Sequence, residues 1–328
     1  MNLAAGTDIG GSPSIGQGMA LATTAPKDLE RALDAHHAWM QGLDGGVRLD
    51  LSYSNLNGID LRGRDLRMAI LKSSSMTNVN LTGAAINSAQ FSNCDLREAN
   101  LTDADLTGAE LKEVNFEHCH LAGASLSEAT VTSCNFQTAV LSGAKLLDAK
   151  LNQCNFTKAV MKATVLQHAR LFDCDLSEAS LEAALFNHAR IRLCRIKESQ
   201  ASEANFSYSF MENSDFRKTQ LVQAKFLKAN LSGGSFCWAA LSNSDFREST
   251  LRGTEFSGAV LFGVRFAGAT LTGADFRGAN LAGARELTSH QMTKAWTSQD
   301  TVLPNGQRGV YLKGSGAERP VPSSLQTA

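Results

Sequence analysis

Two histidines in a regularly spaced polar row are the residues of this chain best suited to chemistry. The row reads Glu128, Asp148, His168, His188 and Tyr208, with twenty residues between successive members. Imidazole nitrogens and carboxylate oxygens are ligands of divalent metals such as zinc. A metal site also needs side chains that converge on one point and hydrogen bonds that hold them there. A flat outer row supplies neither, so we interpret it as solvent-exposed, assign no cofactor, and keep a metal-binding surface as an alternative.

The cysteines form a second regular set that invites a metal or redox interpretation. Six of the seven occupy one position of a five-residue pattern, where they replace alanine. Free cysteine often packs as a small buried apolar residue, so we predict a structural role for these six and no disulfide framework. Cys237 is the exception, because its position faces outward. The six are Cys94, Cys119, Cys134, Cys154, Cys174 and Cys194.

Motifs for catalysis are absent from the sequence. It contains no Ser-His-Asp order, no glycine-rich phosphate loop, no HExxH and no paired CxxC. With 31 basic and 32 acidic residues, the chain carries a formal charge of -1 and has no electrostatic footprint for nucleic acid. The sequence therefore predicts a non-enzymatic protein with no catalytic residues and no generic affinity for DNA.

The elements that position all these residues follow from a period of five. Every fifth residue from Leu51 to Leu281 is apolar, which gives 47 consecutive positions, and Ala201 is the one small member. The residue two places earlier is small, and alanine fills 24 of those 47 positions. This spacing fits neither a helix nor an alternating strand. It indicates a coil built of short sides separated by corners. On each side the small residue and the large residue two positions later both point inward.

Longer intervals give the number of sides. Cys134, Cys154 and Cys174 recur every twenty residues, and Phe206 to Phe276 alternate with leucine or methionine every five. Twenty residues per turn means four sides, so like residues stack on like. At about 4.8 Å per coil, roughly twelve coils predict a rod on the order of 55 Å long.

The stretches ANLTDADLTGAEL and GADFRGANLAGA resemble the pentapeptide repeat family. The resemblance covers about 230 residues in one register. It implies an all-β solenoid, a right-handed quadrilateral β-helix of about twelve coils, to which the sequence adds short α-helical caps at both ends. Family membership implies no single activity.

The ends of such a rod need covers, because open coils expose strand edges and apolar residues. Pro26 and an apolar face of Leu29, Leu33, His37, Met40 and Leu43 predict a helix over residues 25–43. A second short helix is expected over 286–296. The predicted division is a disordered segment 1–24, a capping segment 25–46, the β-helix 47–285, a C-terminal cap 286–312 and a disordered tail 313–328.

Two groups of outward residues are candidates for a partner surface. Tyr208 and Phe210 meet near one corner and Trp238 lies on another, and such outward aromatics are few in this chain. An acidic stretch gives the N-terminal half of the repeat an excess of negative charge. Its members are Glu98, Asp103, Asp105, Glu110, Glu113 and Glu117.

The segment 190–197 looks basic, but its neighbours one coil away indicate ion pairs rather than phosphate binding. Arg195 lies between Asp175 and Asp215, and Arg192 precedes Glu212 by twenty residues. A different irregularity is expected at Ala201, whose small side chain predicts a void or a bend over residues 196–212. Beside Tyr208 and Phe210, such a bend would form a docking notch.

These observations favour a rigid scaffold or docking module for an unknown protein partner. A secretion-system effector or accessory protein of bacterial origin is a variant of this hypothesis. The family resemblance adds an alternative, a DNA mimic that binds or protects a topoisomerase such as gyrase, although the repeat carries 24 acidic and 23 basic residues. No membrane insertion is expected, a cytoplasmic location is predicted with specialised export left open, and a homodimer through a terminal cap is a further expectation.

Overall fold

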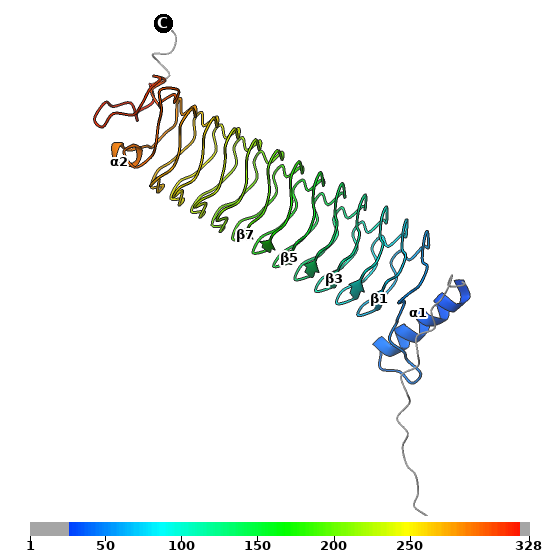
Figure 1. Cartoon of the computed structure of the whole chain (residues 1–328). Helices are drawn as coiled ribbons and strands as arrows, with labels where there is room; N and C mark the ends of the chain where they lie inside the picture. Colours follow the sequence, from blue (N-terminus) through cyan, green and yellow to red (C-terminus); the bar gives the residue numbers. More distant parts are fainter. Residues whose placement is uncertain (1–25, 322–328) are drawn as a thin grey trace, which may run out of the picture.

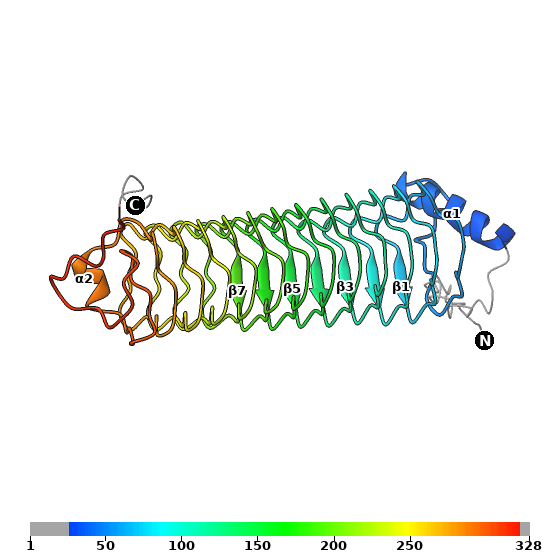
Figure 2. The ribbon, with the colours of Figure 1, turned by 90° about the horizontal axis from the view of Figure 1, so that it is seen from above.

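The computed structural model describes residues 26–321, which form one rod with a cap at each end (Figure 1). The coils follow one another along the rod in sequence order, from the helix α1 (Pro26–Met40) at one end to α2 (Ser289–Met292) at the other. The view from above shows the same coils stacked side by side along the full length of the rod (Figure 2). The predicted solenoid is therefore confirmed.

Parallel pairing between residues twenty apart builds the rod. The pairs run from Asp50↔Ile70 to Arg265↔Arg285 without a change of interval, so each coil takes twenty residues. One side also forms a sheet of seven parallel strands in sequence order, each three residues long. These strands are β1 (Ile70–Lys72), β2 (Gln90–Ser92), β3 (Glu110–Lys112), β4 (Thr130–Thr132), β5 (Lys150–Asn152), β6 (Arg170–Phe172) and β7 (Arg190–Arg192).

The core is a column of apolar side chains stacked from coil to coil. The fifth-position residues from Leu51 to Leu281 are all buried, as the period predicts. Phe116 and Phe136 stack with their ring centroids 4.7 Å apart, and in the C-terminal half neighbouring phenylalanine columns meet edge to face, as Phe206 does with Phe216 at 5.7 Å. Offset stacks and edge contacts are the favoured geometries of aromatic rings. Stacked apolar side chains fill the interior.

Each corner is a turn that requires a left-handed backbone. At most corners, the carbonyl of a fifth-position residue accepts a hydrogen bond from the amide three residues on, as in Ala69 N to Leu66 O at 3.0 Å, whereas the corners that follow β1 to β7 lack this bond. All 47 third residues of these turns, from Tyr53 to Gly283, have positive φ, yet 33 of them are not glycine. Positive φ at this place is the geometry of a type II turn.

The N-terminal cap lays α1 across the first coils. Leu29 and Leu33 are buried as predicted. Leu43 was expected on the same face, but α1 ends at Met40 and Leu43 is exposed. The turn after α1 is closed by backbone hydrogen bonds, among them Leu43 N to Ala38 O at 2.9 Å.

His36, not His37, faces the solenoid, which corrects the predicted helix face. The His36 ring is fully buried, and its Nδ1 accepts the Leu49 amide proton at 3.1 Å. Its Nε2 lies 3.0 Å from the Arg67 carbonyl oxygen, so the proton sits on Nε2. The ring thereby satisfies an open amide of the first coil. Burial lowers the pKa of His36.

The C-terminal cap contains less helix than expected. Instead of spanning 286–296, α2 is a four-residue turn whose N-cap is Thr288. Gln291 donates from Nε2 to the carbonyl oxygens of Phe266 at 2.8 Å and Ala269 at 2.9 Å. The chain then pairs Trp296 with Asp275 and Val302 with Asn280, so the parallel ladder continues for two more pairs.

The sequence-based prediction places the start of the disordered tail at residue 313, which is too early. Ala317 and Glu318 are buried against the cap, and Tyr311 donates its hydroxyl proton to Glu318 Oε2 at 2.9 Å. These residues close the last coil. Residues 1–25 and 322–328, which include the expected disordered N-terminal segment, lie outside the described part.

The irregularity expected at Ala201 is not present. The pairs Ser180↔Gln200 and Gln200↔Gln220 keep their register, and Ala201 N donates to Gln220 O at 2.7 Å. Nearby, Phe206 stacks between the rings one coil above and one coil below it, at 4.9 and 5.1 Å. The register and the ring stack are therefore regular here, and residues 196–212 contain no bend or notch in the ladder.

Candidate functional site

The histidine row is a stack of parallel rings on an outer corner. The rings of His168 and His188 lie 5.0 Å apart at 9°, and those of His188 and Tyr208 lie 5.0 Å apart at 8°. Equivalent nitrogens of two such rings are also about 5 Å apart, whereas one zinc ion bridges nitrogens separated by at most about 4.2 Å. The stacking therefore disfavours a shared metal, and the described residues 26–321 hold no cluster of three metal-ligating side chains.

A shallow groove lies between this corner and the strands β5 to β7. Its volume is about 470 Å³. Tyr208 and Phe210 both contribute to it, so the structure brings together two of the three predicted outward aromatics. Phe210 is 54% exposed. The lining residues are Asp148, Lys150, His168, Arg170, His188, Arg190, Tyr208 and Phe210.

Three cations run along the groove, and we call them the basic ladder: Lys150, Arg170 and Arg190. They are register partners in neighbouring strands, Lys150 with Arg170 and Arg170 with Arg190. The Arg190 guanidinium lies 5.9 Å from the centre of the Phe210 ring, which is the next residue of the same column. The groove is thus a row of three positive charges that ends in an exposed aromatic ring.

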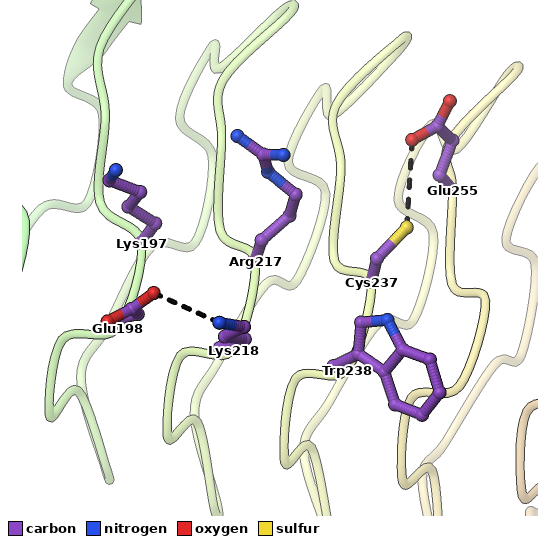
Figure 3. Close-up of a pocket in the computed structure, with 7 residues that line it drawn as sticks. All are labelled: Lys197, Glu198, Arg217, Lys218, Cys237, Trp238 and Glu255. Carbon is purple, nitrogen blue, oxygen red and sulfur yellow. Dashed lines mark hydrogen bonds and ion pairs between the residues drawn. The ribbon is translucent and has the colours of Figure 1, made fainter.

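Trp238 lies in a second groove of about 460 Å³ near a different corner. Figure 3 shows its lining residues on successive coils, with Lys197, Arg217 and Cys237 in one row and Glu198, Lys218 and Trp238 in the next. Several polar side chains of this groove have partners. Lys218 lies 3.3 Å from Glu198, and the Cys237 thiol donates to Glu255 at 3.7 Å.

The Trp238 ring covers the backbone of the next coil. A side chain at Gly258 would approach the Trp238 ring to 2.6 Å, so the indole lies flat against that glycine. Counting corners in the ladder, Tyr208 and Trp238 stand at diagonally opposite edges of the rod. Trp238 therefore does not share a surface with Tyr208 and Phe210.

The acidic candidates do not gather on one face. Residues 98 to 117 make up one complete coil, so their carboxylates are distributed around the circumference. Some have local partners: Gln90 donates to Glu110 at 3.3 Å, and Lys112 lies 3.7 Å from Glu113. The acidic stretch is a band around the rod, and its members are Glu98, Asp103, Asp105, Glu110, Glu113 and Glu117.

A pattern that the sequence analysis missed neutralises many other carboxylates. Six aspartates are followed two residues later by arginine, and each pair is joined by side-chain hydrogen bonds, as in Arg97 to Asp95 at 2.7 Å. The Arg97 guanidinium lowers the pKa of Asp95 through this contact. The recurring letters DLR and DFR are the signal in the sequence. The pairs are Asp60–Arg62, Asp65–Arg67, Asp95–Arg97, Asp215–Arg217, Asp245–Arg247 and Asp275–Arg277.

One of the two predicted pairings in segment 190–197 is confirmed. Arg195 lies 2.9 Å from Asp175. Asp215 instead binds Arg217. Glu212 accepts a hydrogen bond from Asn230 at 2.8 Å and, within the part of the chain that the structure describes, forms no ion pair with Arg192.

The six regularly spaced cysteines are buried, as predicted, and Cys237 is partly exposed. Five of their thiols donate to backbone carbonyls of the preceding coil, as Cys119 does to Leu96 O at 2.6 Å, and the Cys194 thiol donates to Arg192 O. Burial raises the pKa of Cys119 and of Cys134 to about 12. Protonated, enclosed thiols are poor nucleophiles. These side chains complete the core packing.

Fold and surface together define a four-sided parallel β-solenoid whose described surface holds shallow grooves. Models of the family described as pentapeptide repeat region match residues 49–126 and 129–206. Models of pentapeptide repeats in eight copies match 194–233, 229–266 and 259–295. The chain belongs to the pentapeptide repeat family.

Solved structures of other pentapeptide repeat proteins are similar at low identity. HetL from the cyanobacterium Nostoc sp. strain PCC 7120, involved in heterocyst differentiation regulation, is 22% identical, with 83% of this chain and 96% of HetL covered and a TM-score of 0.29. QnrB1, a plasmid-mediated fluoroquinolone resistance protein, is 18% identical, with 68% and 89% covered and a TM-score of 0.33. No curated protein sequence matches. In residues 26–321, no helix is long and apolar enough to cross a bilayer.

Proposed function

We propose that this protein is a non-enzymatic docking module that binds a protein partner along one side of the rod. The observation that carries the proposal is the groove beside β5 to β7, where Tyr208 and Phe210 stand next to the basic ladder. Exposed aromatic and arginine side chains are enriched among residues that contribute most to protein interfaces. The rigid rod holds these side chains in fixed register at little entropic cost.

The shape of the groove supports binding rather than catalysis. Its residues stand on a wall of strands, and the histidine rings stack on one another instead of converging on a reacting atom. Catalytic sites need nucleophile, base and charge-stabilising groups in mutual reach. The groove instead offers charge and aromatic surface over several coils, which suits recognition of an extended partner.

DNA mimicry with gyrase as partner is the alternative that the geometry supports less. A mimic of the duplex needs uncompensated negative charge along its length, whereas six aspartates of this rod are bound to arginines and the acidic stretch forms a band. The fluoroquinolone resistance named for QnrB1 is that protein's property. An inhibition or protection assay with supercoiled DNA and gyrase tests this alternative directly.

Site-specific photocrosslinking tests the docking function. Benzoylphenylalanine replaces Phe210 in one variant and Phe262 in a matched control, because the two side chains are similarly exposed, 54% and 50%. In the native host, the variant at 210 should form a discrete protein adduct that the variant at 262 does not. An equal adduct pattern at both positions, or none at 210, would count against the proposal.

A further inference from the structure

The basic ladder is a run of like charges on a surface where several neighbours from adjacent coils are ion pairs. Lys158 lies 3.6 Å from Glu178, and Lys228 lies 3.3 Å from Glu248, with twenty residues between the partners in each case. Four further cross-coil pairs follow the same interval: Lys162–Glu182, Arg195–Asp175, Lys218–Glu198 and Arg265–Asp245. Like charges twenty residues apart also occur, as in Lys197 and Arg217 or Glu178 and Glu198, but within residues 26–321 only the basic ladder continues to a third member.

In the ladder, three like charges oppose one another instead. Lys150, Arg170 and Arg190 are direct register partners on exposed strand positions. Like charges directly opposite in a sheet are destabilising. Among residues 26–321, no carboxylate forms an ion pair with any of the three. The free protein therefore carries a repulsive row that an anionic ligand would relieve.

The ladder continues into an aromatic end. Phe210 follows Arg190 in the same column, and Tyr208, whose ring is also exposed, lines the same groove. Along the rod axis the groove thus offers three cations and then an apolar contact, one per coil. A complementary ligand presents three anions and then an apolar group at the same interval.

We propose, as a refinement that rests on the docking function above, that this groove binds an acidic α-helix of a partner protein laid along the rod. Carboxylates at i, i+3 and i+7 and an apolar residue at i+10 lie at about 0, 4.5, 10.5 and 15 Å along a helix axis. The four groove positions lie at about 0, 4.8, 9.6 and 14.4 Å along the rod. Each acidic side chain then meets one member of the ladder, and the apolar one meets Phe210.

The spacing favours a helix over other polyanions. In an extended strand, side chains on one face repeat at about 6.7 Å, and in a duplex the charges of one strand repeat at about 3.4 Å. Both move out of register with the ladder within two coils. Phosphate chains also lack an apolar group for Phe210.

A peptide binding assay tests the proposal with the full-length protein. The probe is a side-chain-stapled helical peptide of alanine and glutamine that carries glutamates at i, i+3 and i+7 and leucine at i+10. Its partner probe has the same composition, with the glutamates moved around the helix. The first should bind at least about tenfold more tightly, a difference of about 1.4 kcal/mol. Equal affinity for both peptides overturns the proposal, and so does tighter binding of a single-stranded oligonucleotide of matching charge.

Variants of the protein identify the residues involved. Replacing the ladder with glutamine (Lys150→Gln, Arg170→Gln and Arg190→Gln together) should weaken peptide binding at least tenfold. The control removes three cations elsewhere, at Lys145, Lys225 and Arg252, and should change affinity less than twofold. An equal loss in both variants would show nonspecific charge attraction and overturn the assignment.

Thermal unfolding of the free protein supplies a second readout. Because the ladder members repel one another, Arg170→Gln should raise the melting temperature, and added salt should narrow the difference from the wild type. A lower melting temperature would mean that Arg170 stabilises the coil, and would overturn the repulsion argument. If the peptide fails but the crosslink at 210 persists, the helix proposal falls while the docking function stands.

Discussion

At the scale of single residues, the corners show how much strain a repeated turn tolerates. Thirty-three corner residues without glycine's freedom adopt positive φ, among them Thr138 at 56° and Leu193 at 55°. A left-handed conformation costs an ordinary residue roughly 1–2 kcal/mol. The solenoid imposes it because each corner must return the chain to the next inward position. The core contacts and interstrand hydrogen bonds of each side offset the cost.

Gly253→Ala tests this strain without any steric clash. Gly253 has a φ of +61°, and no atom lies within 4 Å of the place where a Cβ would stand. The variant should therefore lose about 1 kcal/mol of unfolding free energy through backbone conformation alone. Chemical denaturation measures the loss.

The reverse change at Ala163, whose φ is +52°, supplies the control. Ala163→Gly relieves the left-handed strain while adding freedom to the unfolded chain, so it should be neutral or slightly stabilising. If both variants lose the same stability, conformational strain at the corners is not the cause.

The sequence predicts well which residues point into the core, and it predicts less well which contacts the outward side chains form. A period of five fixes which side chains enter the core, so the sequence alone places the fifth-position residues from Leu51 to Leu281 inside. The Asp95 to Arg97 contact could not be placed this way, because it joins a side and its own corner. A search for repeated DLR and DFR would have found that pattern. The ladder from Lys150 to Arg190 needed only the interval of twenty applied to charges.

At the scale of elements, the caps follow tertiary demands more than helix propensity. The sequence of α2 could extend as a helix, but Trp296 must pair with Asp275 to continue the ladder, so the helix stops at Met292. Likewise His36 is turned inward because the open amide of Leu49 needs an acceptor. Neither requirement is visible in local periodicity.

The His36 contact makes the N-terminal cap sensitive to acid. Burial lowers the pKa of His36, and Asp65, Arg48 and Arg67 also act on the ring. In acid the unfolded chain takes up a proton that the folded ring excludes, because the unfolded pKa is about 6.5. The stabilisation by neutral His36 is therefore complete above that pH and is lost as the pH falls through the folded pKa.

Hydrogen exchange at the Leu49 amide measures this effect. Protection of that amide should decrease as the solution is acidified below about pH 6.5. His36→Ala should remove the pH dependence and cost about 1–3 kcal/mol, because it leaves a buried amide without an acceptor. His37→Ala is the matched control, since His37 is exposed. Unchanged Leu49 protection in His36→Ala would contradict the proposed contact.

At the scale of the whole molecule, the residues that stabilise the rod lie in its core, whereas those available for recognition lie on its outer surface. The continuous core makes every coil depend mainly on its two neighbours, so outer columns can vary without disturbing the fold. That freedom explains why the fold was predictable from the repeat, whereas the partner was not. It also means that a functional surface must be found as a departure from the local pattern, and the unpaired charges of Lys150, Arg170 and Arg190 are such a departure.

We predict that the protein self-associates through the C-terminal end of the rod. Leu312 is 67% exposed, and with Trp296 and Val310 it surrounds a hollow of about 550 Å³ on the cap. Exposed apolar residues that gather at one end often mark an interface. A twofold contact there would bury the same surface on both copies and leave the groove at Phe210 free, giving a longer rod with two docking sites.

Light scattering after size exclusion should give twice the monomer mass. Leu312→Glu should restore the monomer, whereas Leu43→Glu at the opposite end should leave the dimer intact. A wild-type protein that remains monomeric at high micromolar concentration would contradict self-association through this cap, and a monomer produced by Leu43→Glu alone would assign the interface to the N-terminal end instead.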